Sequence, residues 1–413
     1  MKPAVATESE IRALRERIRA RFAWDSELSD EELRRMIEQE TFQADWARRM
    51  TAGERKNVVE RLFHSFRGLD ALQPLLEDPE ITEIMINRHD EIFVERRGEL
   101  YRSEIRFESA ERLEHLIQNL VSRVNRIVNE SSPIVDARLP DGSRLHVVLP
   151  PIALRGPCVT IRRFPASPLG MKELVELGAI SEEAAALLKR LVAAKYNFFI
   201  SGGTGSGKTT FLNALSEWIP SHERIITIED TAELKLRGIP NLVALETRNA
   251  NSEGKGSVTM AELIRAALRM RPNRIIVGEV RGPEALDMLQ AMNTGHEGSL
   301  STGHANSPKD MISRLETMVM SGADLPIHVV RQQIASAIDI IVHLSRFRDG
   351  TRKVTEICET AGLKDGEVAL RTLFRFEEMG EKDGRVHGAW VKVSELADVR
   401  KLVFFGLERR KEA

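Results

Sequence analysis

The spacing of apolar residues changes along the chain, and each change indicates a different kind of structure. Over residues 1–72, apolar side chains such as Leu33 and Ile37 recur with helical spacing among charged residues. Ser29 and Glu32 stand three residues apart just before this run, which is the capping-box pattern that begins a helix. The first 72 residues therefore predict a small helical bundle.

Alternation of apolar and polar residues, typical of strands, follows the bundle. Ile84 and Ile86 begin a strand meander, residues 109–129 have helical spacing, and the turn sequence at 140–143 joins a second pair of strands. Residues 73–165 are therefore expected to form an α+β domain.

A third pattern fills most of the remaining chain. Pro168 and Gly170 predict a hinge linker at residues 166–172, and residues 347–413 are expected to form a strand-rich C-terminal appendage. Between them, residues 173–346 alternate strand-like and helical runs, which predicts an α/β domain with a mostly parallel sheet. The expected strands are 196–201, 224–230, 241–247, 274–280, 298–304 and 339–345, and the expected helices are 208–218, 259–271, 283–293 and 307–321.

Composition narrows the classes of function. A chain of 413 residues exceeds what one hydrophobic core usually holds, so several units are expected. The 60 basic and 62 acidic side chains nearly cancel, and aromatic residues make up 5% of the chain. Neither a strong positive field nor a base-stacking surface is indicated, so no nucleic-acid partner is expected.

Cysteine usage and hydropathy bear on location. Cys158 and Cys358 are the two cysteines, a number that fits a reducing cytosol better than a disulfide framework. The sequence contains no apolar run near the roughly 18 residues that a transmembrane helix needs. We expect a cytoplasmic protein without a transmembrane segment, which would meet a membrane by docking onto a protein partner.

Residues 202–209 read GGTGSGKT and match the phosphate-loop pattern GxxxxGK[ST]. A strand-like run precedes the motif and a helical run follows it, as phosphate binding requires. Backbone N–H groups and the helix dipole would attract the phosphates, Lys208 would add a charge, and the Thr209 hydroxyl would take a Mg²⁺ position. The expected nucleotide-binding residues are Gly203, Thr204, Gly205, Ser206, Gly207, Lys208, Thr209 and Thr210.

Acidic residues end two other expected strands. Glu279 is the candidate to polarise the attacking water, with an ion pair to Arg281 as the structural alternative. Gly278 stands where phosphate-loop enzymes often place an aspartate. Thr209 would thus be the main protein ligand of Mg²⁺, helped by carboxylates acting through water. Glu229 or Asp230 would hold part of that hydration shell.

Histidines and arginines complete the candidate set. His304, preferred over His296, would hydrogen-bond the γ-phosphate. Zinc binding by the two histidines is the alternative, but no cysteine or third histidine lies nearby to complete such a site. An arginine delivered from another domain or subunit would act as an arginine finger.

In their order along the chain, these motifs resemble those of the type II and type IV secretion ATPases. GGTGSGKT, ITIEDTAEL, RIIVGEVRG and STGHANS are similar to that family's phosphate loop, aspartate box, Walker B element and histidine box. IMINRHDEIFVERRGEL and ESSPIVDARLPDGSRLHVVLPP look like the N-terminal domain of the CpaF/TadA branch, whose members power Flp-type (Tad) pilus assembly. The absence of four cysteines for a zinc element also favours this branch.

The resemblance implies a RecA-like phosphate-loop core, a homohexamer, ATP and Mg²⁺ as ligands, and inner-membrane platform proteins as partners. It implies a cytoplasmic protein held at the inner membrane by those partners. Matched by position, Glu279, Glu229 and His304 would be catalytic, and Glu229 and Glu279 would reach Mg²⁺ through water. Arg138 and Arg144 would lie where the N-terminal domain of the family covers the nucleotide. Arg269, which matches an arginine before the Walker B strand, would be a further nucleotide-binding arginine.

Two other classes of function stay open from the residues. A nucleic-acid translocase would also use a RecA-like motor, although charge and aromatic content weigh against it. A nucleotide-dependent switch such as a GTPase would bind without much turnover, although no NKxD-type guanine-reading motif is present.

Overall fold

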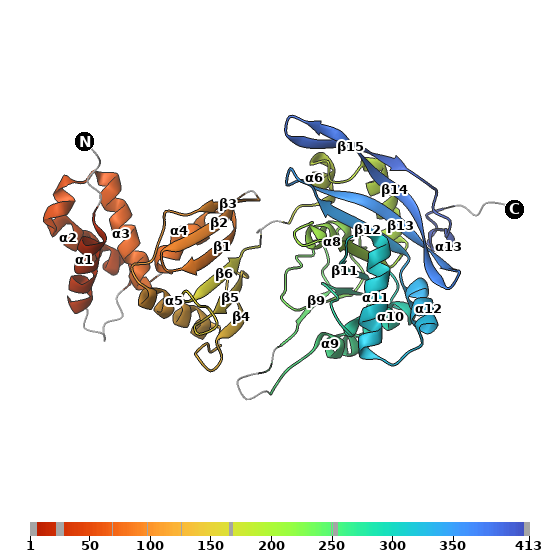
Figure 1. The fold of residues 1–413 in the computed structure, drawn as a ribbon, viewed down its shortest axis with the longest axis horizontal. Coiled ribbons are helices and arrows are strands. Elements are labelled where there is room, and N and C mark those ends of the chain that lie inside the picture. The colour runs from red at the N-terminus through yellow and green to blue at the C-terminus, as the bar shows by residue number, and fades with distance from the viewer. Residues whose placement is uncertain are drawn as a thin grey trace. The chain divides into compact units, whose positions relative to one another are not determined.

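The computed structural model describes residues 6–408 apart from 22–28, 68, 97, 125, 165–167, 249 and 251–254. The chain divides into two compact units, Met1–Pro165 and Ala166–Ala413 (Figure 1). Residues 166–167 of the expected hinge lie outside the described part. No helix within the described ranges combines the length and the apolarity needed to cross a bilayer.

The first unit begins with three helices, α1 (Glu8–Arg21), α2 (Asp30–Gln43) and α3 (Ala52–Arg67). Their apolar faces share one cluster, in which Ile18, Leu33 and Ile37 are almost fully buried. Ser29 caps α2 and Glu32 bonds back to it, so the predicted capping box is confirmed. Short helical turns at Asp45–Arg49 and Asp70–Leu72 and α4 (Gln73–Glu77) complete the helical part.

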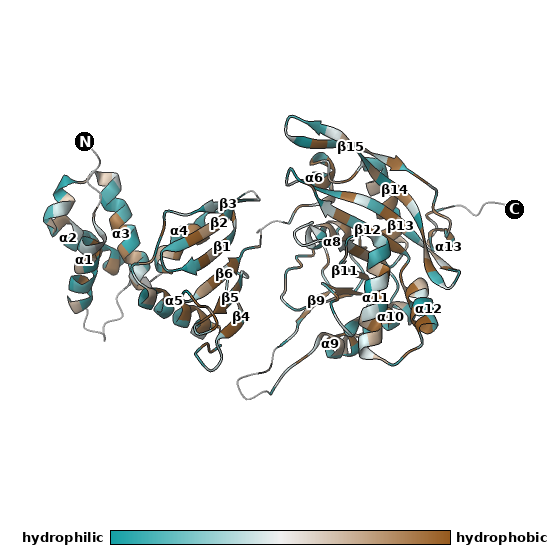
Figure 2. Cartoon of the chain, in the orientation of Figure 1, coloured by the Kyte–Doolittle hydropathy of each residue, from teal (hydrophilic) through white to brown (hydrophobic). Residues whose placement is uncertain are grey.

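An antiparallel six-stranded sheet, in the order β3-β2-β1-β6-β5-β4, forms the rest of this unit. α5 (Ala110–Arg123) packs its apolar residues into the same cluster as the inward residues of the sheet. Figure 2 shows hydrophobic residues concentrated along the strands. The strands are β1 (Ile81–Arg88), β2 (Glu91–Arg96), β3 (Glu99–Arg102), β4 (Ile134–Arg138), β5 (Arg144–Val148) and β6 (Cys158–Arg162).

The second unit is built on a nine-stranded sheet in the order β15-β14-β13-β12-β7-β11-β10-β8-β9. The strands from β12 to β9 in this order pair in parallel, whereas β13, β14 and β15 continue the sheet with antiparallel pairing. Residues 352–392, expected in an appendage, thus extend the same sheet as the core strands. The strands are β7 (Phe198–Gly202), β8 (Ile225–Glu229), β9 (Leu242–Glu246), β10 (Arg274–Val277), β11 (Leu300–His304), β12 (Ile340–Arg346), β13 (Arg352–Lys364), β14 (Glu367–Lys382) and β15 (Arg385–Lys392).

Helices cover both faces of this sheet. Alternate strand residues point to opposite faces, so Phe198 and Ile200 of β7 join one apolar cluster and Phe199 joins the other. α6 (Met171–Glu176), α7 (Glu182–Ala193), α8 (Lys208–Ser216) and α13 (Arg400–Phe404) contribute to the first cluster. α9 (Met260–Ala267), α10 (Glu284–Asn293), α11 (Pro308–Gly322) and α12 (Ile327–Ala337) contribute to the second.

Candidate active site

The phosphate loop connects the fully buried strand β7 to α8. Gly205 and Gly207 have φ angles of 69° and 93°, in the left-handed region that favours glycine. Gly207 is the N-cap of α8, so the first-turn N–H groups, which have no acceptor within a helix, face the loop. Together with the helix dipole, this loop forms an anion-binding cradle.

Lys208, the first residue of α8, carries the positive charge of this cradle. Its side chain is buried, and Nζ donates to the carbonyl oxygens of Gly202 at 3.1 Å and Gly203 at 2.9 Å. Nζ also lies 3.3 Å from Nδ1 of His304. Thr209, the next residue, is half-buried. The ammonium group is therefore fixed where the loop and the end of β11 meet.

His304 ends β11 and stands directly beside Gly202 in the parallel pairing of β11 with β7. Burial lowers the pKa of His304, and the charges of Lys208 and Arg281 lower it further against the opposing effect of Glu279. The imidazole is therefore neutral near pH 7. Because Nδ1 faces a lysine donor, the hydrogen belongs on Nε2, the atom that lies 2.8 Å from Oε1 of Glu279.

Glu279 follows β10, and its two carboxylate oxygens have different surroundings. Oε2 accepts a hydrogen bond of 2.6 Å from Arg281, which raises the pKa of that arginine. Oε1 is buried and accepts no hydrogen bond from the described residues, because the close Nε2 of His304 is poorly aligned with it. The ion pair that was the structural alternative is therefore present, and Oε1 lies against His304 with almost no accessible surface.

Glu229 ends β8 and is 4% exposed. Its Oε1 accepts hydrogen bonds of 2.9 Å from the backbone N–H groups of Glu233 and Leu234. Burial raises the pKa of Glu229 to about 7 in spite of these two bonds. Asp230 is exposed instead, and its carboxylate accepts a bond from Thr247. Of these two acids, Glu229 is the one that the fold holds inside.

Gly278 lies against the side chain of Glu229. A Cβ atom at Gly278 would stand 2.8 Å from Cγ of Glu229, closer than real contacts allow. The Glu229 side chain thus fills the space that a side chain at position 278 would need. This contact gives a physical reason for glycine where an aspartate is common in phosphate-loop enzymes.

An open cavity of about 570 Å³ adjoins the phosphate loop. One side is formed by the loop and the end of β11, and another by the polar face of α11. Arg314 on α11 lowers the pKa of His304 by its charge, and sequence reasoning missed it because an exposed helical arginine has no distinctive signal. The lining residues are Gly203, Thr204, His304, Ala305, Asn306, Asp310, Ser313, Arg314 and Thr317.

The donor set suits a nucleotide-bound Mg²⁺. Among the described residues, no three His, Cys, Asp or Glu side chains gather to hold a metal by themselves. Mg²⁺ commonly keeps several waters and uses one or two protein oxygens together with phosphate oxygens. The Thr209 hydroxyl could supply one protein oxygen to such a Mg²⁺. Glu229 at the end of β8 and Glu279 just after β10 are carboxylates of the kind that bind the waters of Mg²⁺.

The three arginines expected at the nucleotide do not line the cavity beside the phosphate loop. Arg269 is exposed after α9, and the carbonyl of the following Met270 accepts a bond from Arg224, just before β8 begins. Arg269 therefore lies at the amino edge of the sheet, opposite the phosphate loop. Arg138 ends β4 and Arg144 begins β5, both in the first unit.

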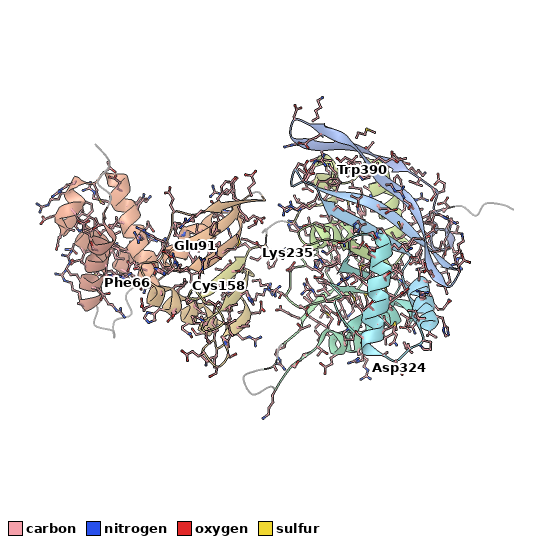
Figure 3. All side chains as sticks on the ribbon, in the orientation of Figure 1. Phe66, Glu91, Cys158, Lys235, Asp324 and Trp390 are labelled. Carbon is pink, nitrogen blue, oxygen red and sulfur yellow. The ribbon has the colours of Figure 1, made fainter. Side chains whose placement is uncertain are left out.

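Two further contacts were not predicted from the sequence. Asn213 on α8 accepts a 2.9 Å hydrogen bond from the backbone of Lys235, labelled in Figure 3, and so ties the loop after β8 to the phosphate-loop helix. Arg352 at the start of β13 donates a 2.9 Å bond to the carbonyl of Gly205. No local pattern indicates this contact, because the strand pairing that brings Arg352 to the loop is long-range.

Comparisons with known proteins find a matching family and several relatives. A family model described as type II/IV secretion system protein matches residues 66–390. A putative conjugal transfer protein of Mycobacterium tuberculosis is 40% identical over 297 residues, 70% of this chain and 84% of that protein. The type IV secretion system protein VirB11 of Brucella suis is 34% identical over 318 residues, 70% of this chain and 88% of that protein.

A solved structure resembles the fold over most of the chain. The ATPase DotB of Yersinia pseudotuberculosis superposes with a TM-score of 0.53 at 19% identity, covering 72% of this chain and 79% of that one. This likeness concerns the fold alone. The expected fold class, a RecA-like α/β core preceded by an N-terminal domain, is confirmed.

Proposed function

Because this chain belongs to the type II/IV secretion system protein family, we propose that it is a motor ATPase that hydrolyses ATP to ADP and phosphate. The observation that carries the proposal is the line of contacts from Lys208 through His304 to Glu279 beside the phosphate-loop cradle. A loop that only bound nucleotide would not need a carboxylate and a histidine in contact with each other beside its lysine.

Each residue of the line has a part in the proposed reaction. The loop N–H groups and Lys208 bind the β- and γ-phosphates, and Thr209 contributes a hydroxyl to Mg²⁺, which would neutralise phosphate charge when bound. Oε1 of Glu279 is proposed to accept a hydrogen bond from the attacking water when the His304 ring moves off it, while Arg281 holds the other oxygen. The neutral His304 contacts both Lys208 and Glu279, and we propose that it couples these two residues to the γ-phosphate.

The finer proposal is that six copies form a ring on the cytoplasmic side of the inner membrane and drive a platform that assembles Flp-type (Tad) pili. The similarity of residues 84–100 and 130–151 to the CpaF/TadA branch supports it. Arg138 and Arg144 are proposed to act on a nucleotide of their own or a neighbouring subunit, and Arg269 on a nucleotide of a neighbouring subunit. Light scattering with ATP should give six times the chain mass of 46.5 kDa; a monomer under these conditions would contradict the ring.

A second candidate function is to power a type IV secretion or conjugal transfer system. The relatives from Brucella suis and Mycobacterium tuberculosis are named for these systems. Affinity capture from membranes separates the candidates. Glu279→Gln is expected to retain ATP and its partners, and Lys208→Ala is the control that cannot hold the phosphates. Pilin-like subunits with an integral membrane platform would support the pilus. A secretion-channel complex would favour the second candidate, and DNA without membrane protein would overturn both.

A further inference from the structure

The hairpin formed by β12 and β13 lies against the phosphate loop. In the parallel pairing of β12 with β7, Leu344 stands opposite Gly202, and a Cβ atom at Gly202 would collide with the Leu344 carbonyl. Two residues further along β12, Arg346 is paired with Arg352, the first residue of β13. The register of the sheet therefore brings two guanidinium groups to the loop.

Arg352 contacts the loop with both its head and its stem. Nε donates a 2.9 Å hydrogen bond to the carbonyl oxygen of Gly205. Cδ lies 3.4 Å from the place where a Cβ atom on Gly207 would stand. Arg346 adds positive charge nearby, with one guanidinium nitrogen 3.7 Å from the Cβ position of Gly205.

This hydrogen bond fixes the orientation of a loop peptide. In a trans peptide the C=O and N–H groups point in opposite directions, so holding the Gly205 carbonyl also sets the direction of the Ser206 N–H. The residues on either side of Ser206, Gly205 and Gly207, have left-handed φ angles, and a glycine changes its backbone conformation there at little energetic cost. The contact with Arg352 adds to the bonds that the loop makes within itself, from the N–H and the hydroxyl of Ser206 to the Gly203 carbonyl.

The turn that carries Arg352 is itself anchored in the C-terminal strands. The Asp349 carboxylate accepts bonds from the backbone of Thr351 at 2.9 Å and of Val386 on β15 at 2.7 Å. The indole of Trp390, labelled in Figure 3, donates a 2.8 Å bond to the carbonyl of Val354 on β13. Strand β15 therefore anchors the β12–β13 hairpin, which in turn contacts the phosphate loop.

We propose that Arg352 is a positioning residue of the nucleotide site, which keeps the phosphate loop in its binding shape and links it to the C-terminal strands. The proposal rests on the proposed function only in taking a nucleoside triphosphate as the ligand of the loop. It also assigns residues 352–392 a role in nucleotide binding.

The test compares two substitutions in the full-length chain by binding of a fluorescent ATP analogue. Arg352→Met keeps the stem against Gly207 and removes the donor, so the Kd should rise about tenfold. Arg352→Lys restores a donor and should recover most of the affinity. Arg375→Ala removes an exposed β14 arginine paired with Glu356 at 3.4 Å, and should leave the Kd unchanged.

Hydrogen exchange of the loop amides adds a reading that needs no ligand. Arg352→Met should speed exchange at residues 205–208 while β7 exchanges as in the wild type. Unchanged affinity or unchanged loop exchange overturns the proposal. If Arg352→Met does not fold, Arg352→Leu, which also lacks a donor, replaces it. A wild type that binds but never hydrolyses ATP would contradict the motor function and leave this test intact, whereas a wild type without binding would end both.

Discussion

Glu229 shows how burial gives a single carboxyl group two properties at once. It accepts the N–H groups of Glu233 and Leu234, which fixes the loop after β8, and it is held in a place where its charged form is costly. A carboxyl group whose pKa lies near 7 changes charge in the range where cells work. The strand-then-acid pattern predicted its position but not its burial.

Stability should therefore depend on pH through Glu229. The folded pKa of about 7 lies above the ordinary 4.5, so the folded protein binds a proton that the unfolded chain releases between these values. Stability is lost as the pH rises through that window. Glu229→Gln keeps an acceptor oxygen and removes the charge, so it should gain about 1–3 kcal/mol over the wild type between about pH 5 and pH 7.5. Urea unfolding at both pH values measures this, and parallel curves for the two proteins would refute it.

Gly278 is the second position where one residue limits its neighbour. Gly278→Ala forces a Cβ atom against Glu229 and should lower the free energy of unfolding by about 1–3 kcal/mol. Gly53 in α3 has open space around its Cβ position, so Gly53→Ala should be neutral or stabilising by up to about 1 kcal/mol. Urea unfolding of both variants tests the contact. Equal stabilities would show that Glu229 moves aside without cost.

At the scale of elements, the amino edge of the large sheet is held by a buried ion pair. Arg274, which begins β10, donates to both oxygens of Glu223, at 2.6 and 3.0 Å, and to the carbonyls of Val192 and Gly298. Both charged side chains are almost completely buried. The Arg274 guanidinium thus joins the end of α7 to the segments that precede β8 and β11, at the edge of the sheet opposite the phosphate loop.

Removing one member of this pair leaves the other charge buried without its partner. Arg274→Met should therefore destabilise the protein by about 3–5 kcal/mol. The matched control is Arg265→Met, because Arg265 pairs with Asp287 at 3.0 Å on the surface and should cost at most about 1 kcal/mol. Denaturant unfolding compares the two, and a similar loss in both variants would contradict the role given to burial.

Local sequence patterns predicted elements well where each element carries its own signals. Ser29 and Glu32 form the predicted capping box of α2, and the helices expected at 259–271 and 307–321 are present as α9 and α11. The phosphate loop, Glu279 and His304 became candidates because each stands at or just after the end of a buried strand, which is a local pattern. The contact of Arg352 with Gly205 depends on the long-range register of β12 with β7 and β13, for which no local pattern exists.

At the scale of the whole molecule, the division near residue 165 separates an antiparallel unit from a mainly parallel one. The finer boundaries 1–72, 73–165, 166–172, 173–346 and 347–413 stay a proposal. β13, β14 and β15 share the sheet of the core, so a change at the phosphate loop has a direct structural path into the C-terminal strands. Motor action requires that hydrolysis at this site changes the shape of the assembly.

ATP turnover by the purified full-length chain tests the central claim most directly. Lys208→Ala removes the phosphate-binding charge and Glu279→Gln removes the acceptor for water. Each should lower kcat/KM by about 100-fold or more. Glu316→Gln is the control, because Glu316 pairs with Arg331 at 2.8 Å on α11 and α12 and should leave turnover unchanged. Rapid phosphate release by the wild type that disappears in both site variants is the predicted result. Substantial turnover surviving in Lys208→Ala and in Glu279→Gln would contradict the assignment of this site as a motor ATPase.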